Sequence, residues 1–194
     1  MSTVGIAGAG STIATEFCGL LPPEERVVAR RIDQLALSYD RYLICTGYLA
    51  GKSLSDISAE QADLTWNLNF VRVARLIDDV IARNGAARIC VIGSESGFSG
   101  SYDAAYAGAK AALHRYVETK RLRTDRQMLV ALAPAIIWDS GMTQRRNDLG
   151  EVERRGDANR MGRWLTAEEV ATEAYHLLYN ASPSLSGQVI RMRP

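Results

Sequence analysis

The sequence predicts a single α/β domain over residues 1–194, built on a doubly wound parallel sheet. Two observations carry this prediction. Short β-branched runs alternate with longer segments of helical periodicity along the chain, which is the order expected of parallel strands joined by helical crossovers. The length of 194 residues also suits one domain and is enough to bury a core without disulfides or a metal.

Six short apolar runs are expected to form the strands, and the segments between them to form helices and loops. The expected strands are 4–7, 26–29, 41–45, 88–92, 128–132 and 188–191. The expected helices are 8–19, about 59–84, 104–123 and 167–179. Residues 144–160 are polar and mixed in charge, and we interpret them as a mobile surface loop that forms a substrate lid.

Composition argues against several classes of partner. The chain carries 23 basic and 22 acidic residues, so no global field favours nucleic acid or an anionic membrane. The first residues lack a basic, apolar leader and no run is long enough to span a bilayer, so we expect a cytoplasmic protein. Cys18, Cys45 and Cys90 are expected to be buried free thiols. His114 and His176 have no cysteine at ligand spacing, and we expect no metal site.

A glycine-rich turn follows the first expected strand. Gly8 and Gly10 precede Ser11, Thr12 and Ile13 at the start of a helix. Small residues allow the backbone to approach a pyrophosphate closely, and the free amides and positive dipole end of the helix favour negative charge. An ordinary tight strand-to-helix turn would have the same pattern, so the neighbouring segments must decide between the two interpretations.

Two arginines, Arg30 and Arg31, lie just beyond the second expected strand. In dinucleotide-binding folds this position holds an acidic residue for the ribose hydroxyls of NAD or a basic residue for the 2′-phosphate of NADP. The pair therefore favours NADP, although solvated surface arginines would look the same. Asp33 nearby keeps NAD possible.

Tyr106 and Lys110 are candidate catalytic residues that share a face of an expected helix. A tyrosine has an ordinary pKa of about 10, and an adjacent ammonium is expected to lower that pKa toward neutrality. Ser94, at the end of the preceding strand, is expected to hold a substrate oxygen, with Ser96 as the alternative donor. A half-buried aromatic beside a solvated amine would give the same Tyr and Lys spacing.

Taken in order, the glycine turn, Ser94 and Tyr106-x-x-x-Lys110 resemble the short-chain dehydrogenase/reductase family, over essentially the whole chain. Asn67 resembles the helix asparagine that supports the lysine through a water molecule, and Asn69 is a close rival for that place. The segment Thr46-Gly47 resembles the Asn-Ala-Gly segment of the family, and 134–137 resembles its Pro-Gly segment.

The resemblance implies a Rossmann-like fold and reversible hydride transfer between the nicotinamide of NADP, or of NAD, and a carbonyl or alcohol substrate. It assigns catalytic roles to Ser94, Tyr106, Lys110 and Asn67, with Tyr106 as acid or base. It also implies a homodimer or homotetramer. The implied cofactor-binding residues are Gly8, Gly10, Ser11, Thr12, Ile13, Arg30, Arg31, Thr46, Gly47, Tyr106, Lys110, Pro134 and Ile137.

One departure from the family is large. The interval from Arg30 to Tyr42 is too short for the helix and strand that the family places there, so we expect a strand-helix unit to be missing. Its loss would leave an exposed sheet edge and remove residues that hold the adenine ring. Two alternatives therefore stay open: a non-catalytic NADP-binding sensor or scaffold, and a sugar-nucleotide epimerase that uses the same residues on the same fold.

Overall fold

The computed structural model describes residues 3–29, 31–145 and 149–194. These form a six-stranded sheet in the order β2-β1-β3-β4-β5-β6, with every neighbouring pair parallel. The doubly wound α/β fold class predicted from the sequence is thus confirmed. The strands are β1 (Val4–Ala7), β2 (Arg26–Ala29), β3 (Arg41–Ile44), β4 (Arg88–Ile92), β5 (Met128–Pro134) and β6 (Val189–Met192).

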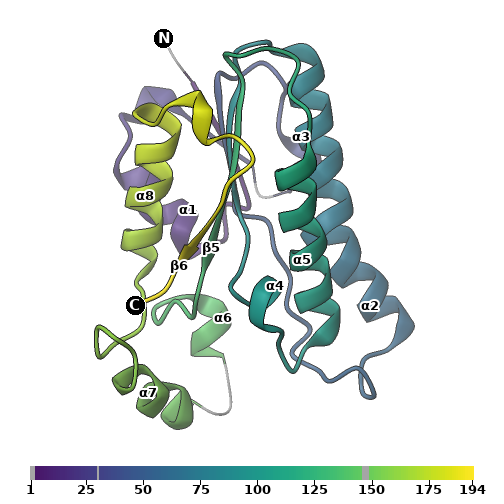
Figure 1. Ribbon diagram of the computed structural model, residues 1–194, viewed down its shortest axis with the longest axis vertical. Helices are drawn as coiled ribbons and strands as arrows, with labels where there is room; N and C mark the ends of the chain where they lie inside the picture. The colour runs from purple at the N-terminus through teal and green to yellow at the C-terminus, as the bar shows by residue number, and fades with distance from the viewer. Residues whose placement is uncertain (1–2, 30, 146–148) are drawn as a thin grey trace.

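Helices cover both faces of the sheet. Figure 1 shows α1 (Thr12–Gly19) and α8 (Ala167–Tyr179) on one side and α3 (Arg72–Arg83) and α5 (Ala104–Thr119) on the other. The remaining helices are short: α2 (Ala59–Trp66), α4 (Ser96–Ser99), α6 (Gly141–Gln144), α7 (Leu149–Asp157), and the 3-10 turns η1 (Pro23–Glu25), η2 (Ile32–Gln34) and η4 (Pro183–Leu185).

The core has two halves because successive strand residues point to opposite faces of the sheet. One half packs against α1 and α8 and receives Ile6, Leu43, Cys90 and Val130 from the strands. The other half packs against α3 and α5 and receives Ala7, Ile44, Val91 and Ala131, the residue next along each of those strands. Both faces of the central strands are therefore buried, as the near-continuous apolar runs predict.

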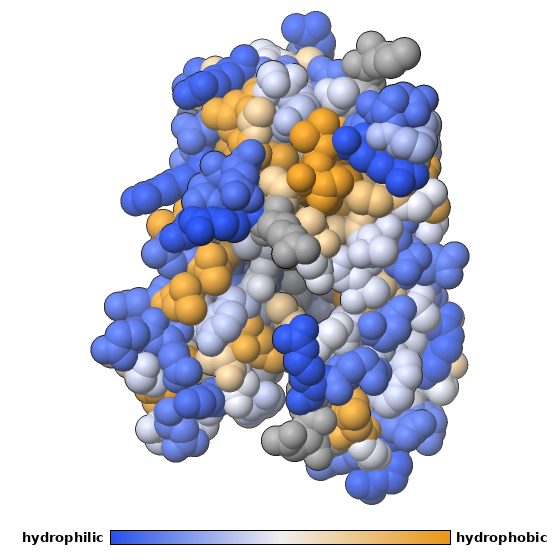
Figure 2. Space-filling model, turned by 180° about the vertical axis from the view of Figure 1, so that it is seen from behind, coloured by the Kyte–Doolittle hydropathy of each residue, from blue (hydrophilic) through white to orange (hydrophobic). Residues whose placement is uncertain are grey.

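The expected gap between the second and third strands is present. The turn η2 is the only helix or strand between β2 and β3 in the described part of the chain, so a strand-helix unit is missing there. Strand β2 forms the edge of the sheet, and the side chain of Val28 is 47% exposed. In Figure 2 apolar residues lie at the surface in the upper half of the view, and a hollow lies below them between two polar lobes.

The long helix expected over 59–84 is continuous but contains a π-helical turn. Helix α2 begins with a capping box between Ser58 and Gln61, and the turn η3 (Asn67–Val71) joins it to α3. A π turn adds one residue per turn and so shifts which side chains face inward. This shift decides which of the two asparagines reaches the interior, as described below.

The expectation of a surface loop over 144–160 is wrong for most of its length, because α7 occupies Leu149–Asp157. Residues 146–148 lie outside the described residues. Val152 is buried, and the Trp164 indole N–H donates a hydrogen bond of 2.6 Å to the Val152 carbonyl. The polar composition concealed a helix because almost all of its remaining side chains face solvent.

Candidate active site

The glycine-rich turn connects β1 to α1 beside the ends of two other strands. The amides of Gly8 and Ala9 donate to the carbonyl of Ala29 at 3.0 and 3.3 Å. Gly8 has a φ of +86°, and a Cβ there would lie 2.8 Å from the carbonyl carbon of Cys45 and from the amide of Thr46. At Gly10, in contrast, a Cβ would meet nothing within 4 Å. The turn is therefore tightly packed at its first glycine and open at its second.

The N-terminus of α1 lacks a side-chain cap, and one hydroxyl near this turn lacks a hydrogen-bond partner. Ser11 does not cap α1 with its side chain, and no acidic residue lies in the first turn of that helix. The hydroxyl of Thr46 is buried and makes no hydrogen bond. The side chain of Ile13 is buried in the core, so it does not line the turn surface. An open glycine, an uncompensated helix N-terminus and an orphaned hydroxyl fit a phosphate-bearing ligand.

Arg31 is engaged with a carboxylate of its own chain. Its guanidinium donates two hydrogen bonds to Asp33, at 3.0 Å from Nε and 2.7 Å from a terminal nitrogen. This bidentate pairing raises the pKa of Arg31 and lowers the pKa of Asp33. The carboxylate thus occupies the fork that a phosphate would take. Arg30 lies outside the described residues.

Helix α5 presents Tyr106 and Lys110, and a buried carboxylate fixes its start. Asp103 is fully buried and caps the helix by accepting from the amide of Tyr106 at 3.0 Å. Its second oxygen accepts from the amide of Gly51 at 2.9 Å, which ties the loop after β3 to α5. Asp103 was not among the predicted site residues, although an Asp directly before the first residue of a helix is an N-cap signal.

Lys110 is buried, with 3% of its surface exposed, and its ammonium donates to the carbonyl of Ile92 at 2.8 Å. Burial lowers the pKa of Lys110 to about 8. Its Nζ lies 5.8 Å from the centre of the Tyr106 ring. Lysine and tyrosine therefore lie together, as their spacing predicts.

The expected effect of Lys110 on Tyr106 is not found in this structure. Burial raises the pKa of Tyr106, and a hydrogen bond with the Ser94 side chain lowers it by less. The charge of Asp103 raises the Tyr106 pKa further. The structure does not bear out the prediction of a lowered pKa, because removing the phenol from water outweighs the favourable interactions.

Ser94, rather than Ser96, is the serine beside Tyr106. The Ser94 side chain is close enough to Tyr106 to lower the pKa of the phenol, and the Ser94 hydroxyl accepts from the amide of Ser96 at 3.2 Å. Ser96 is the first residue of α4. The structure thus brings the preferred serine to the tyrosine and uses the alternative as the start of the next helix.

Of the two candidate asparagines, the structure brings Asn69 and not Asn67 to the lysine. Asn69 is buried within the π turn, whereas Asn67 is exposed. The Asn69 amide donates to the carbonyls of Tyr48 at 2.7 Å and Thr65 at 2.8 Å, and its oxygen accepts from the Tyr48 amide at 3.2 Å. A Cβ at Gly47 would lie 3.3 Å from the Asn69 oxygen and 3.9 Å from Lys110 Nζ, so both groups border this glycine.

The loop after β5 lies against the Ser94 loop. The carbonyl of Pro134 accepts from the amide of Glu95 at 2.8 Å. Ile137 is buried and pairs with Leu165 in an isolated parallel bridge. Both expected residues of this segment are therefore near the carboxyl end of β4, where the site lies.

A histidine that the sequence analysis left without a role contacts the Ser94 backbone. His114 is 3% exposed, and its Nε2 accepts from the amide of Ser94 at 3.3 Å. Its Nδ1 is buried without a hydrogen-bond partner. Burial lowers the pKa of His114 to about 4, with a further lowering by Lys110 and opposing effects of Glu118 and Glu95. Its spacing of four residues from Lys110 is the signal that could have revealed it.

This histidine should make stability depend on pH. Its folded pKa of about 4 lies below the ordinary value of about 6.5, so the unfolded chain binds the extra proton first. The stability contributed by the neutral ring is complete above pH of about 6.5 and is lost as pH falls toward about 4, by up to about 3 kcal/mol. Urea unfolding across this range measures the loss.

The matched control for that measurement is His114→Gln, which keeps an acceptor but does not titrate. The free energy of unfolding of this variant should fall less steeply between pH 6.5 and 4. Equal slopes in the variant and the wild type would contradict the lowered pKa of His114.

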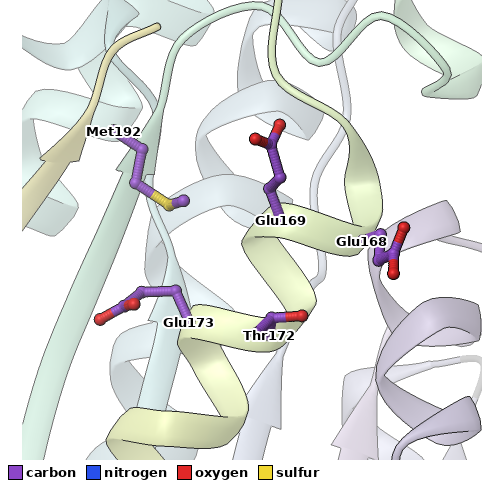
Figure 3. Close-up of a pocket in the computed structure, with 5 residues that line it drawn as sticks. All are labelled: Glu168, Glu169, Thr172, Glu173 and Met192. Atoms are coloured by element: carbon purple, nitrogen blue, oxygen red, sulfur yellow. The ribbon is translucent and has the colours of Figure 1, made fainter.

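Two surface hollows flank the sheet. One, of about 370 Å³, lies between η2 and α3, with Ile32, Leu35, Leu37 and Leu76 among its apolar residues and Arg72 and Arg75 among its charged ones. The other, of about 380 Å³, lies between α8 and β6. Figure 3 shows that its three carboxylates, Glu168, Glu169 and Glu173, point in different directions. Glu169 is paired with Arg163, so these groups do not form a common site.

Comparisons with known proteins give a match in fold and none in sequence. No family model matches the chain, and no curated protein matches it. A polyketide ketoreductase of actinorhodin synthesis, solved with NADPH, is 17% identical, with a TM-score of 0.81 over 99% of this chain and 96% of its own.

Two further solved structures have the same fold. A small-chain dehydrogenase in complex with NADPH is 18% identical, with a TM-score of 0.81 over 100% of this chain and 97% of its own. A short chain dehydrogenase family protein from Francisella tularensis is 17% identical, with a TM-score of 0.83 over 99% and 97%. The chain therefore has the fold of the short-chain dehydrogenases/reductases. None of the described helices is both long and apolar enough to cross a bilayer.

Proposed function

We propose that this protein is an NAD(P)-dependent oxidoreductase that transfers hydride reversibly between the nicotinamide and a carbonyl or alcohol substrate. The observation that carries the proposal is the convergence of Ser94, Tyr106, Lys110 and Asn69 on a fold of this class. Ser94 follows β4, Tyr106 and Lys110 lie on α5, and Asn69 lies in the π turn. Packing alone does not readily explain why four polar groups from three elements meet at the carboxyl end of an interior strand.

NADP is the proposed cofactor, with NAD possible, and it would supply the hydride. Several structural neighbours were solved with NADPH. In this chain the open turn at Gly10 and the N-terminus of α1 would hold the pyrophosphate, and Arg31 the 2′-phosphate. The orphaned hydroxyl of Thr46 and the small residue Gly47 would face the nicotinamide half. The residues at the pyrophosphate and nicotinamide ends fit such a group, whereas Arg31 would have to leave Asp33 to bind the 2′-phosphate.

Tyr106 would give a proton to the substrate oxygen in the reductive direction. Its raised pKa keeps the phenol protonated at neutral pH, which suits a general acid. Ser94 would hold the same oxygen by a hydrogen bond. The Lys110 ammonium, with a pKa of about 8, supplies positive charge next to the phenol at neutral pH. Asn69, in place of Asn67, would order a proton-relay water beside Lys110.

We also propose a substrate lid, an oligomeric state and a class of partner for this protein. The segment 144–160 is proposed as the substrate lid, with α7 as its helical part. A homodimer or homotetramer is proposed, and the exposed Leu64 and Trp66 on α2 offer apolar surface for such contact. The partner is proposed to be a small carbonyl or alcohol substrate, with neither nucleic acid nor membrane involved.

Titration of NADPH and NADH into the protein, followed by nicotinamide fluorescence or heat, tests the cofactor proposal. NADPH is expected to bind more tightly than NADH. Arg31→Ala should weaken NADPH binding by about 10- to 100-fold, because it removes a charge-assisted contact to phosphate, and leave NADH binding unchanged.

Asp33→Asn provides the matched variant. It should tighten NADPH binding by about two- to fivefold because the Arg31 fork no longer has an internal carboxylate partner. Binding of neither cofactor at millimolar concentration would overturn the oxidoreductase proposal. Binding without turnover would favour the scaffold, an alternative that the missing strand-helix unit supports. Product analysis would separate an epimerase from a reductase.

A further inference from the structure

We infer that His114 is a positioning residue for Ser94, acting as a neutral imidazole whose Nε2 holds the Ser94 amide and so fixes the serine hydroxyl toward Tyr106. The positioning role is argued from the contacts between His114 and the loop after β4. Its consequence for turnover rests on the proposed function.

The loop after β4 is built around this ring. A Cβ at Gly93 would lie 2.5 Å from His114 Nε2, and a Cβ at Gly97 would lie 2.5 Å from Cε1 and 2.7 Å from Nδ1. Side chains do not approach so closely, so two glycines on either side of Ser94 make room for the imidazole. The ring therefore fixes the path of the backbone on both sides of the serine.

A second layer holds the ring in place. The Phe98 ring lies against His114, with centroids 4.7 Å apart and planes inclined by 32°. The Arg191 guanidinium lies over the Phe98 ring, 4.3 Å from its centroid, and donates to Glu95 at 3.0 Å. Glu95 directly follows Ser94. Strand β6 thereby clamps the same loop that His114 supports from α5.

The hydrogen bonds define the protonation state of the ring. Because Nε2 accepts from the Ser94 amide, a neutral imidazole must carry its proton on Nδ1. That Nδ1 is buried without a partner, an arrangement that ordinarily costs stability. A residue that merely filled the space would be better satisfied as an apolar side chain. The retained imidazole is explained by the acceptor that it provides to Ser94.

Heteronuclear NMR of the ¹⁵N-histidine-labelled wild-type protein tests the ring directly. The expected spectrum has His114 protonated at Nδ1 and unprotonated at Nε2 throughout the range from pH 5 to 8. His176 is the other histidine of the chain, and the spectrum of a His176→Gln variant assigns the signals that belong to His114. A proton on Nε2, or titration of His114 near its ordinary value, would overturn the inference.

A pair of variants tests the consequence for turnover. The Gln oxygen in His114→Gln can reach the position of Nε2, whereas the shorter Asn in His114→Asn cannot. His114→Gln should keep kcat near the wild-type value. His114→Asn should lower kcat for carbonyl reduction by about 10- to 100-fold with an unchanged Kd for NADPH, because Ser94 is displaced.

Equal losses in both variants, matching their losses in thermal stability, would assign His114 to packing and overturn the inference. The NMR measurement needs no turnover. An inactive wild-type protein would therefore count against the proposed function, and the spectrum would still decide the role of the ring.

Discussion

Replacing Tyr106 by Phe is expected to lower kcat for carbonyl reduction by about 10²- to 10⁴-fold while leaving the Kd of NADPH nearly unchanged. The variant keeps the ring and removes only the hydroxyl that would protonate the substrate oxygen. The raised pKa of Tyr106 makes this loss largest in the reductive direction at neutral pH, where the phenol is fully protonated. Single-turnover oxidation of NADPH by a panel of aldehydes and ketones, followed by absorbance, measures it.

The control is Tyr175→Phe, which makes the same change on α8, on the opposite face of the sheet. Tyr175 packs beside Phe17 and Tyr179 through its ring, so loss of its hydroxyl should leave turnover and cofactor binding as they are. Wild-type turnover by Tyr106→Phe would remove the tyrosine from the reaction and require a different proton donor.

The second large effect is expected at Gly8. Gly8→Ala should lower the free energy of unfolding by about 2 to 4 kcal/mol, because it adds two costs. A residue with a side chain is strained at the φ of +86°, and the new methyl would lie 2.8 Å from backbone atoms of Cys45 and Thr46. Backbone atoms at the end of β3 cannot move aside without disturbing the sheet. Urea unfolding at neutral pH gives the value.

Gly10→Ala is the matched control two residues away. A methyl there meets nothing within 4 Å, so the free energy of unfolding should stay within about 1 kcal/mol of the wild type. The same methyl would cover the open surface proposed for the pyrophosphate, so NADPH affinity should fall in this stable variant. Equal stability of the two alanine variants would contradict the close packing described for Gly8.

Most of the sheet could be predicted from the sequence because its four central strands, β1, β3, β4 and β5, are buried on both faces. Runs such as 89–92 are apolar throughout, and β1, β2 and β4 begin and end at the predicted residues. Helix α7 was missed because only Val152 and Gly156 of its nine residues are buried, which leaves almost no apolar stripe to detect.

The sequence predicts that Ser94, Tyr106 and Lys110 lie together. It does not reveal the features of the candidate site that depend on three-dimensional packing. Asn67 and Asn69 are two residues apart, and only the π turn determines which of them faces inward. The pKa of Tyr106 depends on how deeply the folded chain buries the phenol, which spacing along a helix does not reveal. The spacing of His114 from Lys110 places both on one face of α5, but only the fold brings the ring to the Ser94 amide in the loop after β4.

The missing strand-helix unit lies at the margin of the sheet, so its loss leaves the central strands unchanged. In the common doubly wound order the absent strand would lie outside β2, at the margin of the sheet. Its loss leaves the ladders of β1 with β2 and of β1 with β3 in register. Strand β4, which Ser94 follows, is separated from β2 by two strands, β1 and β3. The segment between residues 31 and 41 can thus be shortened or rebuilt at the margin of the sheet without moving the strands that carry the proposed reaction centre.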